Sequence, residues 1–334
     1  ICAVQSVPEL EKGTMNFLSV RPGDLQNDTL FIHSVNGIQR EGNPSYALKV
    51  KTTELKYGVP PTAYQPEVGY RLQTNDTRVL SALKVADEIQ YVQTTNIPGH
   101  DASAIFHGIV DLNSGEVKNN YILSDSFDYA YPSITYAGTD DRPYASVITF
   151  SHSSEWHFPG TSAILHNKTK GRESIFSNPV RIKNGEGLIN SFIEDSLERW
   201  GDYTGIQMKY NEPGVVWMSG SYGSSFNRVG VWIGKLKVNS ELDVAIDENS
   251  LLVYPNPIAN RSTVQIGLES ESEVQIMLTS SKGDIVRELF NGNLEAGEHV
   301  LSFDRQALRS GMYILSIFNN ADHKVLESYR VFIE

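Results

Sequence analysis

Polar and apolar side chains alternate with a period of two along most of this 334-residue chain, from about residue 15 to residue 238. That period puts successive side chains on opposite faces of a β-strand, whereas a helix needs a period of about 3.6. Turn-forming clusters such as Asn36-Gly37 separate the alternating runs. The pattern therefore predicts an all-β fold. The predicted strands are residues 29–35, 46–52, 79–85, 89–95, 104–111, 133–137, 145–151, 161–166, 215–219 and 229–238.

Composition excludes several other classes of protein. Residues 188–197 are the one helix-like window, and this window is short and polar, so we predict a loop there. No run of apolar residues is long enough for a transmembrane helix, so we expect no transmembrane segment. The net charge of −12 argues against nucleic acid as a partner. Cys2 is the single cysteine, so no internal disulfide can form.

The predicted strands fall into similar groups, which indicates an internal repeat. Three groups are clear, around residues 78–110, 131–165 and 199–233, and a fainter one lies near residues 16–55. A spacing of about 55–70 residues, with three or four short strands in each group, is typical of β-propeller blades. We therefore expect about four blades within residues 1–239.

The third group carries a family resemblance. Residues 199–203 read Arg-Trp-Gly-Asp-Tyr, and apolar strands with Trp217 and Trp232 follow them. Together with residues 140–143 of the preceding group, they resemble the last blades of sialidase-like propellers in secreted bacterial proteins. Such propellers close with about six to eight blades. The resemblance therefore implies that residues 1–239 are the C-terminal part of a larger propeller, with N-terminal blades missing.

The last part of the chain has a different organisation. Residues 240–250 are acidic and lack glycine, which is typical of a linker. Residues 251–334 contain seven short alternating segments separated by turn clusters. Seven strands in so short a stretch predict a small antiparallel β-sandwich.

Four motifs follow one another in this C-terminal part: Tyr-Pro-Asn-Pro at 254–257, a glycine turn at 283, another at 297, and Gly-Met-Tyr at 311–313. In this order they resemble the type A C-terminal sorting domain of the type IX secretion system of Bacteroidota. The motif residues are Tyr254, Pro255, Asn256, Pro257, Gly283, Gly297, Gly311 and Tyr313, with Ile333 and Glu334 at the end. The family tends to finish on a basic residue, and in this chain Glu334 stands there.

The resemblance implies an immunoglobulin-like sandwich that acts as an export signal. It implies a route through the periplasm and outer membrane, with a shuttle barrel of the PorV type, a translocon and a sortase as partners. The sortase would remove the signal near the linker, leaving the cargo secreted or attached to the outer-membrane surface. The alternative is an accessory immunoglobulin-like domain that only packs or spaces.

The sequence offers no catalytic constellation. Arginines are scattered through the repeats, and the Asp-box of sialidases, Ser-x-Asp-x-Gly-x-x-Trp, is missing. Neither a Gly-x-Ser-x-Gly motif nor a nucleotide-binding motif occurs, and no activating histidine lies near Cys2 in the sequence. We therefore expect a protein that is not an enzyme and needs no cofactor.

Two segments are candidates for ligand binding. His152, Glu155 and His157 lack the spacing of a zinc motif, but Trp156, His157 and Phe158 could form an aromatic platform for a sugar ring. Asp140 and Asp141 are weak calcium candidates, although adjacent aspartates more often belong to a solvated turn.

The leading hypothesis is therefore a non-enzymatic surface protein whose propeller binds glycan or protein. Two alternatives stay open. One is a secreted glycoside hydrolase, or another propeller enzyme, whose catalytic residues lie in the missing blades. The other is a structural adhesin.

Overall fold

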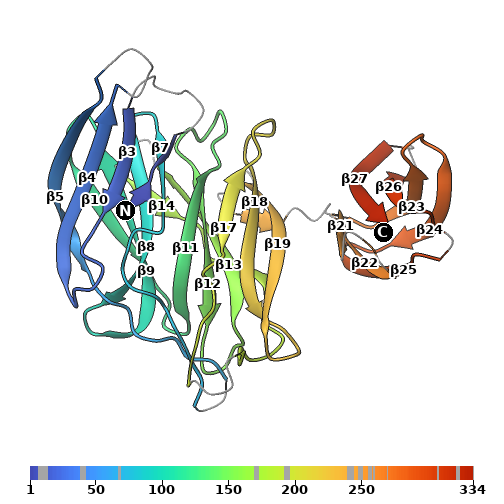
Figure 1. Cartoon of the computed structure of the whole chain (residues 1–334), viewed down its shortest axis with the longest axis horizontal. Coiled ribbons are helices and arrows are strands. Elements are labelled where there is room, and N and C mark those ends of the chain that lie inside the picture. Colours follow the sequence, from blue (N-terminus) through green and yellow to red (C-terminus); the bar gives the residue numbers. More distant parts are fainter. Residues whose placement is uncertain are drawn as a thin grey trace. The chain divides into compact units, whose positions relative to one another are not determined.

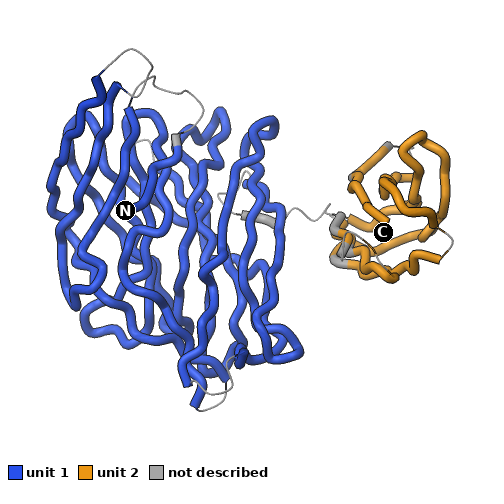
Figure 2. The backbone as a smooth tube through the Cα atoms, viewed as in Figure 1, with its two compact units in different colours: residues 1–245 blue, residues 246–334 orange. Residues whose placement is uncertain are grey.

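The computed structural model describes residues 1–6, 14–37, 43–66, 69–168, 173–191, 196–238, 244–246, 251–254, 258, 260–268, 270–306, 308–320 and 324–333. These residues form strands, turns and loops, so the predicted all-β class is confirmed. Among them, no helix is long and apolar enough to cross a membrane. The chain divides into two compact units, residues 1–245 and residues 246–334 (Figure 2).

Unit 1 contains four larger β-sheets. The first has the order β1 (Cys2–Ala3), β3 (Thr14–Ser19), β4 (Asn27–Asn36), β5 (Ser45–Tyr57). The second has the order β10 (Val117–Ile122), β9 (His100–Asp111), β8 (Glu88–Ile97), β7 (Ser81–Val85), β2 (Gln5–Ser6). The third has the order β11 (Asp128–Tyr136), β12 (Ser146–Ser153), β13 (Gly160–Lys168), β14 (Ser174–Phe176), with β15 (Val180–Lys183) also on β13. The fourth has the order β17 (Gly205–Met208), β18 (Val215–Gly223), β19 (Val229–Val238), β20 (Val244–Ile246).

The four sheets pack face to face in chain order, as the colour sequence of Figure 1 shows. Leu30 and Ile32 of the first sheet share a core with Tyr91 and Phe106 of the second. A further core joins the second sheet to the third; it contains Leu83, Val92, Ile105, Ile134, Ile148 and Phe150. The first eight residues of β8 are all buried. Such a continuous buried run is expected of a strand between two layers.

A short parallel pair links distant parts of unit 1. β6 (Arg71–Leu72) pairs with β16 (Leu197–Glu198). β6 lies between the first and second sheets in sequence, and β16 lies between the third and fourth. The connections between sheets are therefore fixed to one another. The described residues of the window 188–197 form no helix, which agrees with the predicted loop, and its last residue begins β16.

The predicted linker differs from the structure at one point. Val244–Ile246 forms β20 and extends the fourth sheet, and the boundary between the units falls after Ala245. Alternation alone could not reveal this strand because it has only three residues and acidic flanks. The other residues of the predicted linker, 240–243 and 247–250, lie outside the described part of the chain.

Unit 2 consists of two sheets around one apolar core. The first has the order β21 (Leu251–Tyr254), β22 (Arg261–Leu268), β25 (Gly297–Asp304). The second has the order β24 (Ile285–Leu294), β23 (Ser272–Ser280), β26 (Gly311–Asn319), β27 (Lys324–Ile333). Val264 and Phe303 from one sheet pack with Ile276 and Leu315 from the other. The seven strands correspond to the seven alternating segments of the sequence.

Candidate functional site

The two ends of unit 2 lie together. β21 ends at Tyr254, and residues 255–257 of the Pro-Asn-Pro motif lie outside the described part. The chain returns at Ile258, whose N–H donates to the carbonyl of Phe332 at 2.7 Å and which forms a parallel bridge with Ile333. Both isoleucines are buried. The residue that follows the first motif is thus paired with the C-terminal strand; Glu334 itself is not described.

All three motif glycines, Gly283, Gly297 and Gly311, have a positive φ that strains other residues. Gly283 has φ +90° in the turn between β23 and β24, and its N–H donates to the carbonyl of Ser280 at 2.9 Å. Gly297 has φ +118° at the start of β25. Other residues rarely adopt positive φ, because their Cβ clashes with the backbone. These glycines therefore fix where the strands turn.

Gly311 and Tyr313 begin β26, the strand next to the C-terminal one. Gly311 is opposite Ile333 and Tyr313 is opposite Val331 in the antiparallel register. The Tyr313 ring is buried, and its hydroxyl donates to the carbonyl of Arg309 at 2.8 Å. The motif residues that the structure describes therefore contribute to the fold of unit 2.

In unit 1, the predicted aromatic platform lies on the hairpin loop between β12 and β13. The Ser154 hydroxyl accepts hydrogen bonds from the backbone N–H groups of Trp156, at 3.2 Å, and His157, at 3.1 Å. This turn leaves the Trp156 side chain 82% exposed. The His157 ring instead packs against Phe127, with 4.7 Å between centroids, while Phe158 is only partly exposed. Trp156 is thus the one of the three that is presented fully to solvent.

Tyr64, from the segment between β5 and β6, lines the same two hollows as Trp156. Its N–H donates to the Asp128 carboxylate at 2.9 Å, and its carbonyl accepts a hydrogen bond from the Ser153 hydroxyl. The Arg71 guanidinium lies over the Tyr64 ring, 3.2 Å from the centroid, and donates to the carbonyl of Thr62 at 2.6 Å. A cation stacked on a tyrosine face fixes both side chains.

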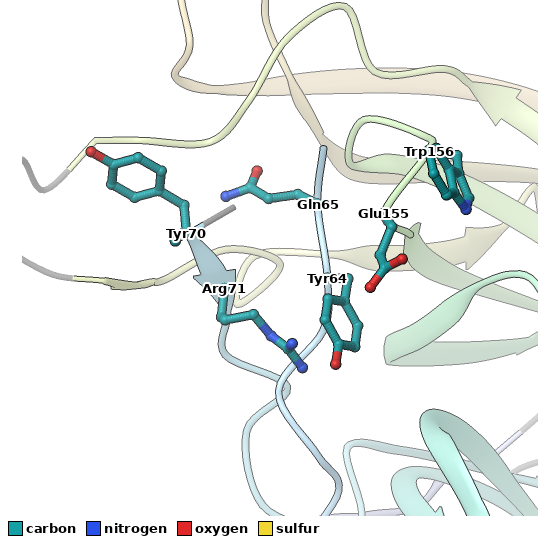
Figure 3. Close-up of a pocket in the computed structure, with 7 residues that line it drawn as sticks. Tyr64, Gln65, Tyr70, Arg71, Glu155 and Trp156 are labelled. Atoms are coloured by element: carbon teal, nitrogen blue, oxygen red, sulfur yellow. The ribbon is translucent and has the colours of Figure 1, made fainter. Parts of the chain in front are cut away.

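Two hollows share Tyr64, Glu155 and Trp156. The first has a volume of about 410 Å³ and is also lined by Gln65, Tyr70 and Arg71 (Figure 3). The second has a volume of about 280 Å³ and is also lined by Asp125, Phe127 and Asp128. We call the two hollows together the Trp156 groove. It combines aromatic faces with carboxylates and one guanidinium, a lining suited to a neutral polar ligand with apolar faces.

Burial sets the protonation of two groups beside the groove. It raises the pKa of the Asp128 carboxyl, and the hydrogen bonds from the N–H groups of Tyr64 and Ser103 oppose this rise. It lowers the pKa of His152 to about 3, with the charge of Arg181 as a second cause. The neutral His152 ring pairs with the Ser162 hydroxyl at 2.8 Å. His152 therefore packs inside the third sheet and does not join Glu155 and His157.

The calcium candidates Asp140 and Asp141 are exposed on a tight turn, which is closed by hydrogen bonds between Thr139 and Arg142. Within the described ranges, no three histidine, cysteine, aspartate or glutamate side chains come close enough to hold a metal ion. In that part of the chain, no third histidine, cysteine, aspartate or glutamate side chain joins these two aspartates.

Sequence reasoning missed Tyr64, Gln65, Arg71 and the role of Glu155. The available signal was the proline-rich run 59–66, Val-Pro-Pro-Thr-Ala-Tyr-Gln-Pro, which interrupts the strand pattern. Such a run rules out a regular strand and keeps a segment extended. It does not reveal that the segment crosses to the hairpin loop of the third sheet.

Comparison with known proteins finds a family match for unit 2. Residues 252–328 match the family model of the secretion system C-terminal sorting domain. No curated protein matches the chain. Two solved structures align at 9% identity and a TM-score of 0.25, values that support no inference about fold or function. One is PorZ, described as an essential bacterial surface component of the type IX secretion system of Porphyromonas gingivalis; the alignment covers 97% of this chain and 58% of PorZ.

The other is dimeric latent PorU from Porphyromonas gingivalis, where 99% of this chain aligns with 32% of that one. The chain thus spans less than two thirds of either protein. What identifies it is the match of residues 252–328, which agrees with the four motifs and their places in the fold of unit 2. The chain therefore carries a C-terminal sorting domain of the type IX secretion system, the signal for export to the cell surface or the medium.

Proposed function

We propose that this chain is a type IX secretion cargo of a Bacteroidota bacterium whose unit 1 binds a carbohydrate in the Trp156 groove. One observation carries the binding proposal: Trp156 is 82% exposed although its loop is held rigidly. An exposed indole opposite a fixed tyrosine provides two flat surfaces for the apolar faces of a sugar. Glu155, exposed beside the indole, supplies hydrogen-bond acceptors of the kind that sugar hydroxyls need.

In this proposal the four stacked sheets are blades of a sialidase-like β-propeller, and unit 2 is an immunoglobulin-like sandwich. The support for the propeller is that four sheets, antiparallel except for the β2–β7 pair, pack in chain order. The Trp156 groove then lies at one end of the blades, where loops between strands gather. Loops held by a rigid scaffold commonly carry binding residues.

Export would proceed through the periplasm, with a PorV-type shuttle barrel, an outer-membrane translocon and a sortase as partners. β24 and β27 are the edge strands of the larger sheet of unit 2, which is the position at which strand addition occurs. At the end of β27 the Phe332 carbonyl already accepts a hydrogen bond from Ile258. Deletion of residues 251–334 should leave the truncated protein in the periplasm, as cell fractionation would show. Surface delivery of the truncated protein would refute the signal role.

Binding is tested with a glycan array, followed by calorimetry on the sugar that binds. Trp156→Ala should weaken binding by about tenfold, because one aromatic stacking contact contributes up to about 1.5 kcal/mol. The matched control is Tyr203→Ala, since Tyr203 is 88% exposed and does not line the groove. An array on which the wild type binds nothing would favour the structural adhesin. Release of shortened oligosaccharides from the bound sugar would favour the hydrolase.

A further inference from the structure

The Trp156 groove consists of two hollows that meet at a common wall. Tyr64, Glu155 and Trp156 line both hollows, and we call these three residues the shared wall. Beyond the shared wall the first hollow continues to Tyr70, and the second continues to Ser126. In Figure 3, Tyr70 and Trp156 stand at opposite sides of the first hollow. A ligand that touches Trp156 can therefore extend from it in two directions.

The shared wall is held in place by hydrogen bonds to the rest of unit 1. The Ser154 hydroxyl accepts a hydrogen bond from the N–H of Trp156 at 3.2 Å. The Tyr64 N–H donates to the Asp128 carboxylate at 2.9 Å, and the Ser103 N–H donates to the same carboxylate at 2.8 Å. A binding surface that is already ordered loses little entropy when a ligand binds. Both hollows are therefore formed in advance, on either side of one fixed wall.

The two hollows offer different contacts to a ligand. Arg71 lies over one face of the Tyr64 ring, 3.2 Å from its centroid, and lines only the first hollow. The carboxylates of Asp125 and Asp128 line only the second hollow. The first hollow thus presents N–H donors, whereas the second presents acceptors that suit sugar hydroxyls. Two successive units of one sugar chain would have different surroundings, which gives the bound chain a preferred direction.

Charge restricts the kind of sugar that the groove can take. Three carboxylates line the second hollow, those of Asp125, Asp128 and Glu155, and no described lysine, arginine or histidine lines it. In the first hollow the charge of Arg71 is opposed by Glu155. An acidic sugar, with a carboxylate or a sulfate of its own, would be repelled from the second hollow. The lining therefore favours an uncharged chain.

We propose that the Trp156 groove binds an uncharged glycan chain along its length, with one sugar unit in each hollow and the linkage between them beside the shared wall. The inference rests on the proposed carbohydrate binding and adds the length, the charge and the binding mode of the ligand. Each hollow also reaches an exposed residue outside the shared wall, Gly69 in the first and Ser126 in the second. The chain can therefore continue past both hollows, and a terminal sugar is not required.

Calorimetry on residues 1–334 tests the length and the charge of the ligand. The probes are mono- to tetrasaccharides of glucose, mannose, xylose and N-acetylglucosamine, together with fragments of any other glycan that the array finds. A disaccharide should bind about tenfold more tightly than its monosaccharide, because its second unit gains contacts in the second hollow. Raising the salt concentration from about 50 mM to about 500 mM should leave the affinity unchanged, because an uncharged ligand has no charge to screen.

One variant in each hollow shows whether a single ligand occupies both. Tyr70→Ala removes a side chain that lines the first hollow, and Ser126→Trp places a large side chain in the second. Each should lower the affinity for the tetrasaccharide by about tenfold, towards that of the monosaccharide. Tyr203→Ala, at an exposed position outside the groove, is the control and should change nothing. Tyr70→Leu takes the place of Tyr70→Ala if the alanine variant has a lowered melting temperature.

The outcomes separate this inference from the proposed function. If neither the probes nor any glycan on the array bound, both would fail. If a sugar bound in a way that depends on Trp156, but the monosaccharide bound as tightly as the tetrasaccharide, only the present inference would fail. It would also fail if just one of the two hollow variants weakened binding, or if salt abolished it. Loss of binding after methylation of the terminal sugars of the tetrasaccharide would show recognition of a chain end and would overturn binding along the chain.

Discussion

The two units of this chain differ in what they bury. Among the described residues of unit 2, the buried polar residues are Ser262 and Ser316, and the rest of the core is apolar. Unit 1 instead buries histidines, glutamine and an ion pair between its second and third sheets. An apolar core tolerates variation in packing, whereas buried polar groups fix which partners must meet. The two units should therefore respond differently to pH and to the loss of a charge.

The polar layer of unit 1 runs along β8, β9, β12 and β13. Glu88 pairs with Lys168, both almost completely buried, and the Ser146 hydroxyl donates to the Gln90 side chain at 2.7 Å. The His107 ring lies 4.5 Å from the His166 ring. Burial lowers the pKa of His107 to about 3 and holds the pKa of His166 well below its ordinary value.

The largest expected contrast is the response to acid. Above about pH 6.5 the histidines are neutral in the folded and the unfolded chain alike. Below this pH both histidines are protonated in the unfolded chain, whereas in the folded chain His107 and His152 stay neutral down to about pH 3. The free energy of unfolding of unit 1 therefore falls as the pH is lowered. For these two groups the loss between pH 7.5 and pH 5 is about 4 kcal/mol. Urea unfolding followed by tryptophan fluorescence measures unit 1 alone, because all four tryptophans lie there.

His107→Leu is the matched variant for this experiment. It removes one of the groups, so the stability of unit 1 should fall less steeply with pH. An unchanged slope would show that His107 does not stay neutral in the folded state. Unit 2 provides the internal comparison, because its described histidine, His299, is not buried.

The next largest effect is expected from breaking the buried ion pair. Lys168→Met leaves the Glu88 carboxylate buried without its partner, which should cost about 4 kcal/mol of unit 1 stability. Replacing both residues, Glu88→Gln with Lys168→Met, should restore much of the loss. Lys209→Met is the control, because its pair with Glu212 is partly exposed and such pairs contribute about 1 kcal/mol or less. If Lys168→Met and Lys209→Met lowered the stability of unit 1 equally, burial would not explain the cost of breaking the Glu88–Lys168 pair.

The fold could be predicted from the sequence where strands and turns are set by neighbouring residues. In unit 2 the strand boundaries are local: Gly283 and Gly297 mark turns, and alternation marks the strands between them. The order of motifs therefore predicted seven strands and a sorting signal. The second and third sheets of unit 1 were equally visible as alternating runs, because their strands are long and apolar.

The Trp156 groove was only partly predictable, because its contacts span large distances in sequence. Tyr64 is fixed by Asp128, 64 residues away, and Gln65 pairs with the backbone of Ile189, 124 residues away. No local pattern encodes such pairs. Trp156 was predictable as an exposed aromatic next to two further rings, but its opposite wall was not.

A cavity in the apolar core tests unit 2 on its own. Leu315→Ala should destabilise unit 2 by about 3 kcal/mol, because Leu315 is completely buried between the two sheets. Export should fall with it, while the tryptophan fluorescence of unit 1 stays native. Val325→Ala, at a position 45% exposed on β27, is the control and should change neither. If a Leu315→Ala protein with an unfolded unit 2 were still fully exported, export would not require unit 2 to be folded.

The smallest effect is expected at a turn. Gly283→Ala forces a side chain into φ +90°, where nothing nearby would clash, so the cost comes from the backbone alone and should be about 1 kcal/mol. Gly23→Ala in unit 1 also meets open space but without a positive φ, and should change stability by less than about 0.5 kcal/mol. Calorimetric melting of both variants measures the difference. If Gly283→Ala were as well tolerated as Gly23→Ala, the hydrogen bonds between Ser280 and Asp284 would be enough to hold the turn. The stability of unit 2 would then not require glycine at position 283.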